Sequence, residues 1–188
     1  GKLTIKNYAY TSGFSYIGGI IGSNDSSGIA SIANCTNTGD IDCDCPAAIR
    51  LGGVAAYTGC DLLNSRFAGT ITAKRLAYVS ASRHGSVGGL IGYTAQGITG
   101  GSVDCVINAE GKGAIAVGGV VGTSGSDTWT GTIVKADLTA SADASCGLLL
   151  GGKVSSGNST VKLGSTTSPI YIYKSSKMNG TAIRADGN

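Results

Sequence analysis

The densest group of chemically useful side chains is the stretch Asp40-Ile-Asp-Cys-Asp-Cys45, where carboxylates and thiols crowd together. If it forms a β-strand, its three aspartates share one face, and oxygen ligands at that density invite Ca²⁺. An EF-hand loop, however, needs Gly at its sixth position and Glu at its twelfth, where this chain has Cys45 and Leu51. The single Cys-x-Cys pair lacks the second pair of a zinc site. We expect an exposed polar edge and no cofactor or metal, with Asp40, Asp42 and Asp44 as weak candidate ligands.

Acid–base catalysis has few residues to use in this chain. His84 is the only histidine and Glu110 the only glutamate, and no Gly-x-Ser-x-Gly elbow marks a nucleophile. A glycosidase needs two carboxylates about 5–10 Å apart, and the aspartates of residues 40–44 are the only clustered acids. A lyase base would come from Lys74, Arg75 or Arg83, which have no acids near them in sequence. We therefore expect no enzymatic activity and a surface position for His84.

Three aromatic residues are candidates for ligand binding. Tyr57 and Tyr93 each directly follow the same repeated apolar segment, so they occupy equivalent positions in adjacent repeats. If their rings face outward they form a stacked pair that binds a sugar or a partner's side chain, and if inward they cap the core. Trp129 lies on the following segment of the fourth repeat and would extend the same face.

The composition describes one globular domain. The chain has 188 residues, of which 32 are Gly and 2 are Pro, and only 13% are charged. The net charge of +3 is too small to predict a nucleic-acid partner. The sequence has no run of 18 apolar residues that could span a membrane. From Gly1 onward it shows no charged segment followed by an apolar one, so we expect no signal peptide within it, and secretion stays open.

An apolar hexapeptide recurs along the chain. Its starts lie 34, 36, 30 and 28 residues apart, and the fifth copy is degraded. A second element follows, first as residues 34–41 and 64–71, then in altered form as 104–110 and 132–138. The hexapeptide copies are Ile17-Gly-Gly-Ile-Ile-Gly22, Leu51-Gly-Gly-Val-Ala-Ala56, Val87-Gly-Gly-Leu-Ile-Gly92, Val117-Gly-Gly-Val-Val-Gly122 and Ser145-Cys-Gly-Leu-Leu-Leu150.

These repeats predict an all-β fold, a parallel β-helix or β-solenoid of about five coils. The segments are short, rich in Val, Ile and Thr, and bounded by Gly, Ser, Asn and Asp, with no helical period. A propeller blade would need about 40–45 residues and four strands. We expect a right-handed coil by default.

The Gly-Gly pairs lack the Lys and helix start of a phosphate loop, so they mark places where a Cβ would collide with a neighbouring coil or a covering segment. Because each hexapeptide is apolar throughout, we expect a strand covered on both faces.

The repeats resemble the GLUG repeat, named for its Gly-Leu-any-Gly core. Gly89-Leu-Ile-Gly92 matches that core outright, Gly19-Ile-Ile-Gly22 and Gly119-Val-Val-Gly122 match with another aliphatic residue, and Gly53-Val-Ala-Ala56 departs at the last Gly. The resemblance covers roughly residues 17–150. It implies a scaffold or adhesive module of secreted and surface-anchored bacterial proteins, including surface lipoproteins, and it brings no catalytic residues.

We interpret the chain as a single repeat domain, with an N-terminal cap over residues 1–16, repeats over 17–165 and a C-terminal cap over 166–188. Within the C-terminal cap, Pro169-Ile-Tyr-Ile-Tyr-Lys174 alternates as a half-buried strand should.

The predicted function is a non-catalytic extracytoplasmic scaffold or adhesion module that binds a surface glycan or protein through an exposed solenoid face. A carbohydrate-active β-helix enzyme, a polysaccharide lyase or a glycosidase, is the alternative. The expected location is extracellular or at the cell surface, with an outer-membrane lipoprotein as the parent.

The six cysteines give a geometric test of the repeat alignment. Cys35 and Cys105 each follow the polar residue that opens a second element, with one coil between them. Equivalent residues two coils apart are about 9.6 Å apart, beyond the reach of a disulfide. Both are therefore expected as free thiols, and any bridge would join Cys60 to Cys43 or Cys45.

Overall fold

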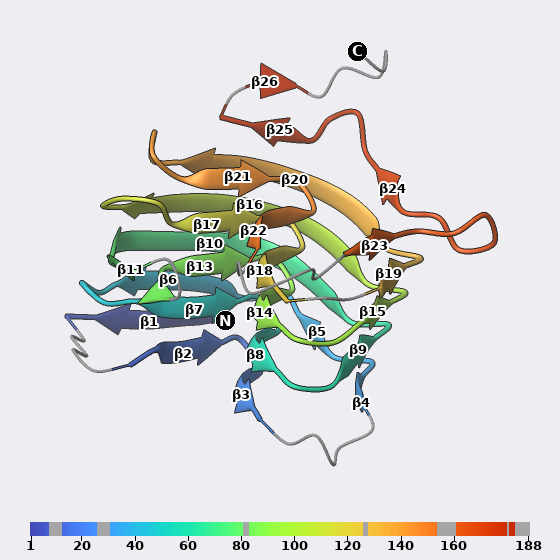
Figure 1. Ribbon diagram of the computed structural model, residues 1–188, viewed down its shortest axis with the longest axis horizontal. Coiled ribbons are helices and arrows are strands. Elements are labelled where there is room, and N and C mark those ends of the chain that lie inside the picture. The colour runs from blue at the N-terminus through green and yellow to red at the C-terminus, as the bar shows by residue number, and fades with distance from the viewer. Residues whose placement is uncertain are drawn as a thin grey trace.

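The computed structural model describes residues 1–7, 13–25, 31–80, 83–125, 128–153, 161–179 and 181–182 (Figure 1). Within these ranges the chain forms β-strands and no helix. No described segment is therefore a helix long and apolar enough to cross a membrane. Almost all strand pairs are parallel, because each strand lies beside its equivalent in the next repeat.

Four sheets run along the stack, and each takes one segment from every coil. Sheet A contains β1 (Lys2–Lys6), β5 (Thr36–Asn37), β6 (Asp40–Asp44), β10 (Arg66–Leu76), β16 (Ser102–Gly111), β20 (Ile133–Ala140), β24 (Tyr171–Ile172), β25 (Lys177–Met178) and β26 (Thr181–Ala182). Sheet B contains β2 (Ser15–Gly18), β7 (Ile49–Gly52), β13 (Ser86–Gly88), β17 (Ala116–Gly118) and β21 (Ser145–Gly147). Sheet C contains β3 (Ile21–Asn24), β8 (Ala55–Thr58), β14 (Ile91–Thr94), β18 (Val121–Ser124) and β22 (Leu150–Lys153). Sheet D contains β4 (Ser31–Ala33), β9 (Asp61–Leu63), β15 (Ile98–Thr99), β19 (Thr128–Thr130) and β23 (Lys162–Leu163).

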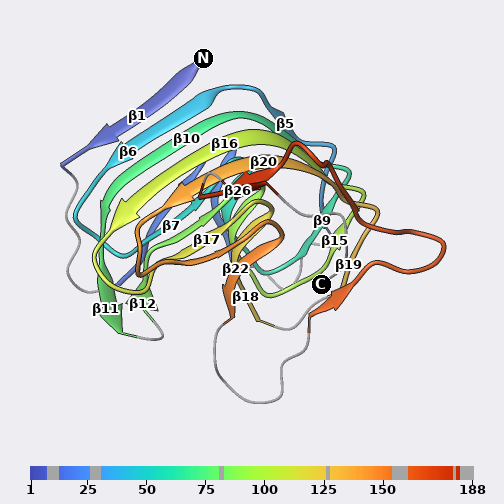
Figure 2. The same cartoon turned by 90° about the horizontal axis from the view of Figure 1, so that it is seen from above.

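The chain visits the sheets in the order B, C, D, A and then begins the next coil, as the view along the stack makes plain (Figure 2). Four turns are complete, and the short strands β21 to β25 begin a fifth. The predicted β-solenoid is confirmed, and the expected count of about five coils is slightly high. A small antiparallel pair, β11 (Tyr78–Ser80) and β12 (Arg83–His84), projects from the second coil.

The hexapeptide is a sharp bend between two sheets, which corrects the expectation of one continuous strand. In the third coil Val87 and Gly88 end β13, Gly89 and Leu90 make the bend, and Ile91 starts β14. Sheets B and C lie against each other beside the bend, since a Cβ on Gly92 of the third copy would meet backbone atoms of Leu51 of the second copy in sheet B. The covering segment expected for this apolar run is thus part of the chain itself.

The Gly-Gly pair is structural, as predicted, and its two glycines meet different neighbours. A Cβ on Gly88 would overlap the carbonyl oxygen of Ile91 within the same bend. A Cβ on Gly89 would overlap the carbonyl oxygen of Gly119, which belongs to the bend of the next coil. In the fifth coil Gly147 is the register partner of Gly118, so the copy begins at Cys146, one residue later than the sequence alignment placed it. Leu148 therefore takes the place of the second glycine, and its carbonyl oxygen is the one that faces Gly119.

Stacked apolar side chains fill the interior. On sheet A, Ile41, Ile71, Ile107 and Leu138 stand in register on four neighbouring strands and are at most 1% exposed. Residues between them point outward, because side chains alternate along a strand. β16 displays this alternation over its whole length, with Val103, Cys105, Ile107 and Ala109 inside.

The corner between sheets D and A fixes the repeat register. Asn34, Asn64, Gly100 and Gly131 follow equivalent strand ends and all have positive φ, between 47° and 67°. Asparagine and glycine adopt this left-handed backbone most readily. The equivalent of Asn34 in the third coil is therefore Gly100, and the alignment that placed Asp104 there was wrong. Cys105 instead lies beside Gly69 in strand β10, farther along sheet A than the level of Cys35.

The terminal segments extend sheet A. β1 pairs with β6 as an edge strand, and β24 and β25 pair with β20 at the other end. β26 then turns back antiparallel to β25. The prediction of a half-buried strand over residues 169–174 is wrong, because the side chains of Tyr171, Ile172 and Tyr173 are 60%, 41% and 54% exposed.

Candidate functional site

Tyr57 and Tyr93 form a stacked pair on sheet C. They are register partners on β8 and β14, their ring centroids are 5.4 Å apart, and the ring planes differ by 10°. Both side chains are half-buried. The hydroxyl of Tyr57 donates a hydrogen bond of 3.0 Å to Asp25 Oδ1. The sequence placed these two residues together correctly, and each ring covers part of the other's face, which leaves ring edges and hydroxyls for a ligand.

Arg50 completes this site, and sequence reasoning missed it. It lies on β7 of sheet B, which the hexapeptide bend brings beside sheet C. Its guanidinium carbon is 4.0 Å from the ring centroid of Tyr93 and 3.9 Å from that of Phe14. The rings of Tyr57 and Tyr16 are 5.2 and 5.7 Å away. A guanidinium held over several ring faces gains cation–π attraction, about 0.5–2 kcal/mol for a contact of this kind.

We call Phe14, Tyr16, Arg50, Tyr57 and Tyr93 the aromatic–arginine cluster. Tyr16 is the register partner of Arg50 on the first coil, is 41% exposed, and has its ring 5.8 Å from that of Tyr57. Phe14 adds a further ring, 6.3 Å from Tyr16. The one sequence signal was a charged residue directly before an apolar hexapeptide, at a position whose register equivalents in the other coils are Tyr16, Ser86, Ala116 and Ser145.

Trp129 does not belong to this surface, contrary to expectation. It lies on β19 of sheet D, where it is the register partner of Ile98, and it is 1% exposed. Its ring fills the interior of the stack beside the apolar residues of the neighbouring coils. Trp129 is therefore a core residue.

The acidic stretch forms β6, and its three aspartates alternate with inward-facing Ile41 and Cys43, as the strand interpretation predicted. Each carboxylate has a protein partner. Lys2 Nζ lies 3.2 Å from Asp42, and the backbone N–H of Thr70 donates to Asp40 Oδ1 at 2.8 Å. Among the described residues, no group of three or more His, Cys, Asp or Glu side chains is arranged to hold a metal ion.

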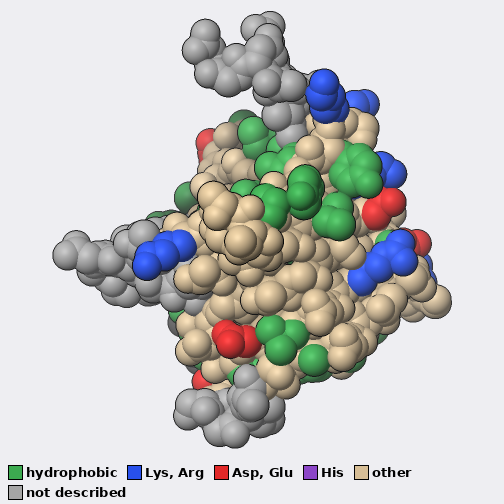
Figure 3. Space-filling view, turned by 90° about the vertical axis from the view of Figure 1, so that its right-hand side faces the viewer, with side chains coloured by type: hydrophobic (Ala, Val, Ile, Leu, Met, Phe, Trp, Pro, Cys, Tyr) green, Lys and Arg blue, Asp and Glu red, His purple; other side chains and the backbone are tan. Residues whose placement is uncertain are grey.

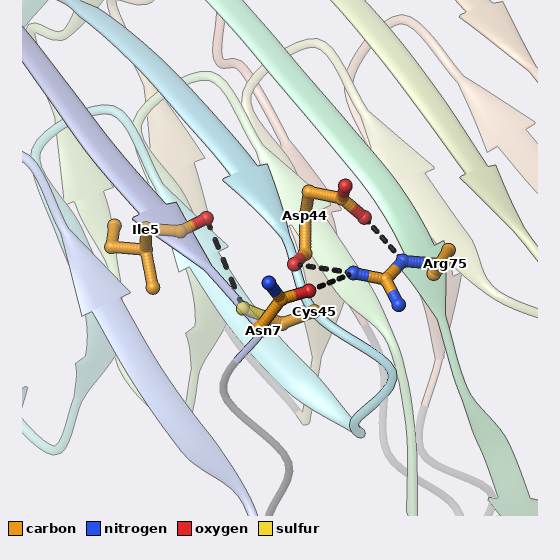
Figure 4. A network of polar contacts seen from close by, with 5 residues as sticks. All are labelled: Ile5, Asn7, Asp44, Cys45 and Arg75. Carbon is orange, nitrogen blue, oxygen red and sulfur yellow. Dashed lines mark hydrogen bonds and ion pairs between the residues drawn. The ribbon is translucent and has the colours of Figure 1, made fainter.

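Arg75 is the partner of Asp44 and ties three strands of sheet A together (Figure 4). Its Nε donates to the Asp44 carboxylate, and its Nη2 donates to the Asp44 carbonyl at 3.1 Å and to Asn7 Oδ1 at 2.8 Å. The hydrogen bond from Arg75 holds the pKa of Asp44 below its usual value. Arg75 therefore has a structural role, because it holds the ends of these strands together.

His84 is half-buried, which corrects the expectation of a surface residue. Its ring lies 6.2 Å from that of Tyr78, and its Nε2 is 3.5 Å from Thr123 Oγ1. Thr123 in turn lies 2.7 Å from Ser86 Oγ, which donates to the carbonyl of Gly92. This polar chain joins sheets B and C across their bend.

All six cysteines are free thiols, including Cys35 and Cys105. Burial raises the pKa of Cys105 to about 12 and, together with the neighbouring Cys45, raises that of Cys43 as well. These thiols pack as small apolar residues.

Hydrophobic surface also gathers near the C-terminal end of the stack. In the view onto the side of sheet D, polar side chains and backbone dominate, and hydrophobic side chains cluster toward the C-terminal end (Figure 3).

A shallow hollow of about 500 Å³ lies on the outer side of sheet A and is lined by Asp104, Val106, Lys135, Asp137 and Lys177 among others. Asp104 forms an ion pair of 3.1 Å with Lys135, and Asp137 is the register partner of Lys177.

Comparison with protein families matches residues 15–42 to the GLUG motif. The match spans β2 to β6, the first coil, with its Gly-Gly bend between sheets B and C. The same bend recurs in the following coils. No curated protein and no solved structure matches this chain significantly.

Proposed function

We propose that this GLUG-repeat β-solenoid is a non-catalytic, extracytoplasmic scaffold or adhesion module that binds a glycan or a protein through its aromatic–arginine cluster. The observation that carries the proposal is the stacked Tyr57–Tyr93 pair beside Arg50, half-buried on a regular solenoid. Aromatic side chains and arginine are the residues most enriched where proteins bind partners. The location at a cell surface, in a lipid-anchored parent protein, belongs to this proposal and follows the resemblance of the repeats to those of bacterial surface proteins.

The alternative, a polysaccharide lyase or glycosidase, lacks a supporting observation. It would need two carboxylates facing each other across a cleft, one of them free to donate a proton. Asp42 and Asp44 are engaged by Lys2 and Arg75, and Asp40 lines a hollow beside the start of β1. That hollow, of about 290 Å³, contains no second acid.

A glycan array combined with a lyase and hydrolase screen tests the proposal. The wild-type chain should retain a glycan or protein ligand without cleaving it. Tyr57→Ala and Tyr93→Ala should each weaken that ligand about tenfold while the melting temperature stays within a few degrees. Tyr171→Ala is the matched control, because Tyr171 is a highly exposed tyrosine far from the cluster in sequence and on another sheet. Cleavage of any glycan, or equal loss of binding in the control, would reject the proposal.

A further inference from the structure

Arg50 differs from Arg75 in what its donors meet. Arg75 makes three hydrogen bonds to Asp44 and Asn7. Within the described part of the chain, the guanidinium of Arg50 makes ring contacts and neither a hydrogen bond nor an ion pair. Ring contacts occupy the faces of a guanidinium, whereas its five N–H groups point outward in the plane of the group.

These donors are open to solvent on a half-buried side chain, since no Arg50 nitrogen is among the buried polar atoms that lack a partner, and they are therefore available to a ligand. Burial lowers the pKa of Arg50, as expected for a cation withdrawn from water. A bound anion would both restore the hydrogen bonds and neutralise the charge. The rings of Phe14 and Tyr93 meanwhile hold the guanidinium in place, so that little side-chain entropy remains to be lost on binding.

We propose, as a refinement that rests on the proposed function, that Arg50 binds the carboxylate of an acidic sugar residue, so that the ligand is a carboxylated glycan. A carboxylate has two oxygens in one plane, which matches the planar fork of a guanidinium in a bidentate pair.

The charge of the surroundings selects a single negative charge. The Asp25 carboxylate lies near enough to Arg50 to offset part of the lowering of its pKa by burial. The same carboxylate accepts a hydrogen bond from the Tyr57 hydroxyl. One cation beside one carboxylate favours a monoanion over a doubly charged phosphate monoester. The same Asp25 oxygens and the tyrosine hydroxyls are acceptors and donors suited to sugar hydroxyls, which alternate around a pyranose ring.

Titration calorimetry with defined oligosaccharides tests this assignment. The probes are a hexuronic-acid oligosaccharide, its fully methyl-esterified form, a neutral hexose oligosaccharide of equal length and a sulfated one. The wild-type chain should bind the acid at least tenfold more tightly than its ester, since esterification removes the charge and keeps the shape. Added salt should weaken binding of the acid and leave binding of the ester almost unchanged.

Two substitutions isolate the fork geometry. Arg50→Gln should abolish the preference for the acid over its ester, and Arg50→Lys, which retains the charge and a flexible stem, should still lose about tenfold in affinity for the acid. Arg66→Gln, at an exposed arginine on sheet A, is the control and should change neither affinity by more than twofold. Melting curves report the fold of each variant, and Arg50→Lys provides the test if Arg50→Gln does not fold.

The outcomes separate the refinement from the broader proposal. Equal binding of acid and ester, unchanged affinity in both Arg50 variants, or tighter binding of the sulfated probe would overturn the carboxylate assignment. If neutral glycans bind and depend on Tyr57 and Tyr93 alone, the proposed function stands and the refinement fails. If no glycan binds in this assay or on the array, the refinement fails, and only a protein ligand is left to the broader proposal.

Discussion

Gly89→Ala should destabilise the fold severely, because the added methyl group has no space between two coils. Its Cβ would overlap the carbonyl oxygen of Gly119 and come within 3.1 Å of Val103 Cγ1. Restoring normal contact, at ~3.5 Å, requires the bends of the third and fourth coils to separate by about 1.4 Å.

That separation breaks the hydrogen bonds that join the two bends. The backbone N–H of Gly89 donates to Gly118 at 3.2 Å, and those of Leu90 and Ile91 donate to Val120 at 2.9 and 3.1 Å. Three bonds at about 1 kcal/mol each, together with about 1–3 kcal/mol of overpacking, are partly offset by ~0.5–1 kcal/mol from the stiffer unfolded chain. The free energy of unfolding should therefore fall by about 3–5 kcal/mol, a large share of the ~5–15 kcal/mol typical of a domain.

Urea denaturation followed by far-ultraviolet circular dichroism measures this loss. Gly125→Ala is the matched control, since the nearest atom to its added Cβ is Tyr93 Oη at 3.7 Å, and it should cost less than about 0.5 kcal/mol. A Gly89→Ala protein within about 1 kcal/mol of wild type would refute the close approach of the coils.

Three further measurements probe other parts of the molecule. The pKa of Asp44 is held below 3.8 by Arg75, so its ion pair stabilises the fold at neutral pH and is lost as the pH falls through the folded-state pKa; Asp44→Asn should lower the urea midpoint near pH 7 and not near pH 2. Because burial raises the pKa of Cys105 to about 12, iodoacetamide should alkylate Cys35 well before Cys105 in the folded protein, and peptide mapping with a urea-unfolded control will detect any reversal. Fluorescence of Trp129 should resist quenching by acrylamide until the protein unfolds, whereas strong quenching of the native state would place the ring at the surface.

The solenoid could be predicted because its main signals are local. Each Gly-Gly pair repeats at coil spacing, and strands such as residues 102–111 alternate inward and outward side chains. The split of the hexapeptide between two sheets could not be predicted, because both halves are apolar and a bend between them leaves no polar residue as a marker. Periodicity identifies repeated segments more readily than it identifies where a segment turns.

Only part of the candidate site could be predicted from the sequence, for a related reason. Tyr57 and Tyr93 share a repeat position, so their stacking follows from the alignment alone. Arg50 approaches them from another sheet, and that contact depends on how closely sheets B and C fold together at the glycine bend. Trp129 was misplaced because a two-fold alternation does not say which side of a three-residue strand faces the interior.

The residue after the first glycine of each bend determines how closely the next coil can pack. In the first four coils it is a glycine, because the following coil's carbonyl oxygen occupies the space of a side chain. In the fifth it is Leu148, whose own Cβ would exclude a sixth coil of the same pattern. Duplication of a Gly-Gly unit can therefore lengthen the stack at any point before Leu148, whereas copying the last unit into the interior would interrupt it. Additional Gly-Gly units therefore fit on the N-terminal side of Leu148.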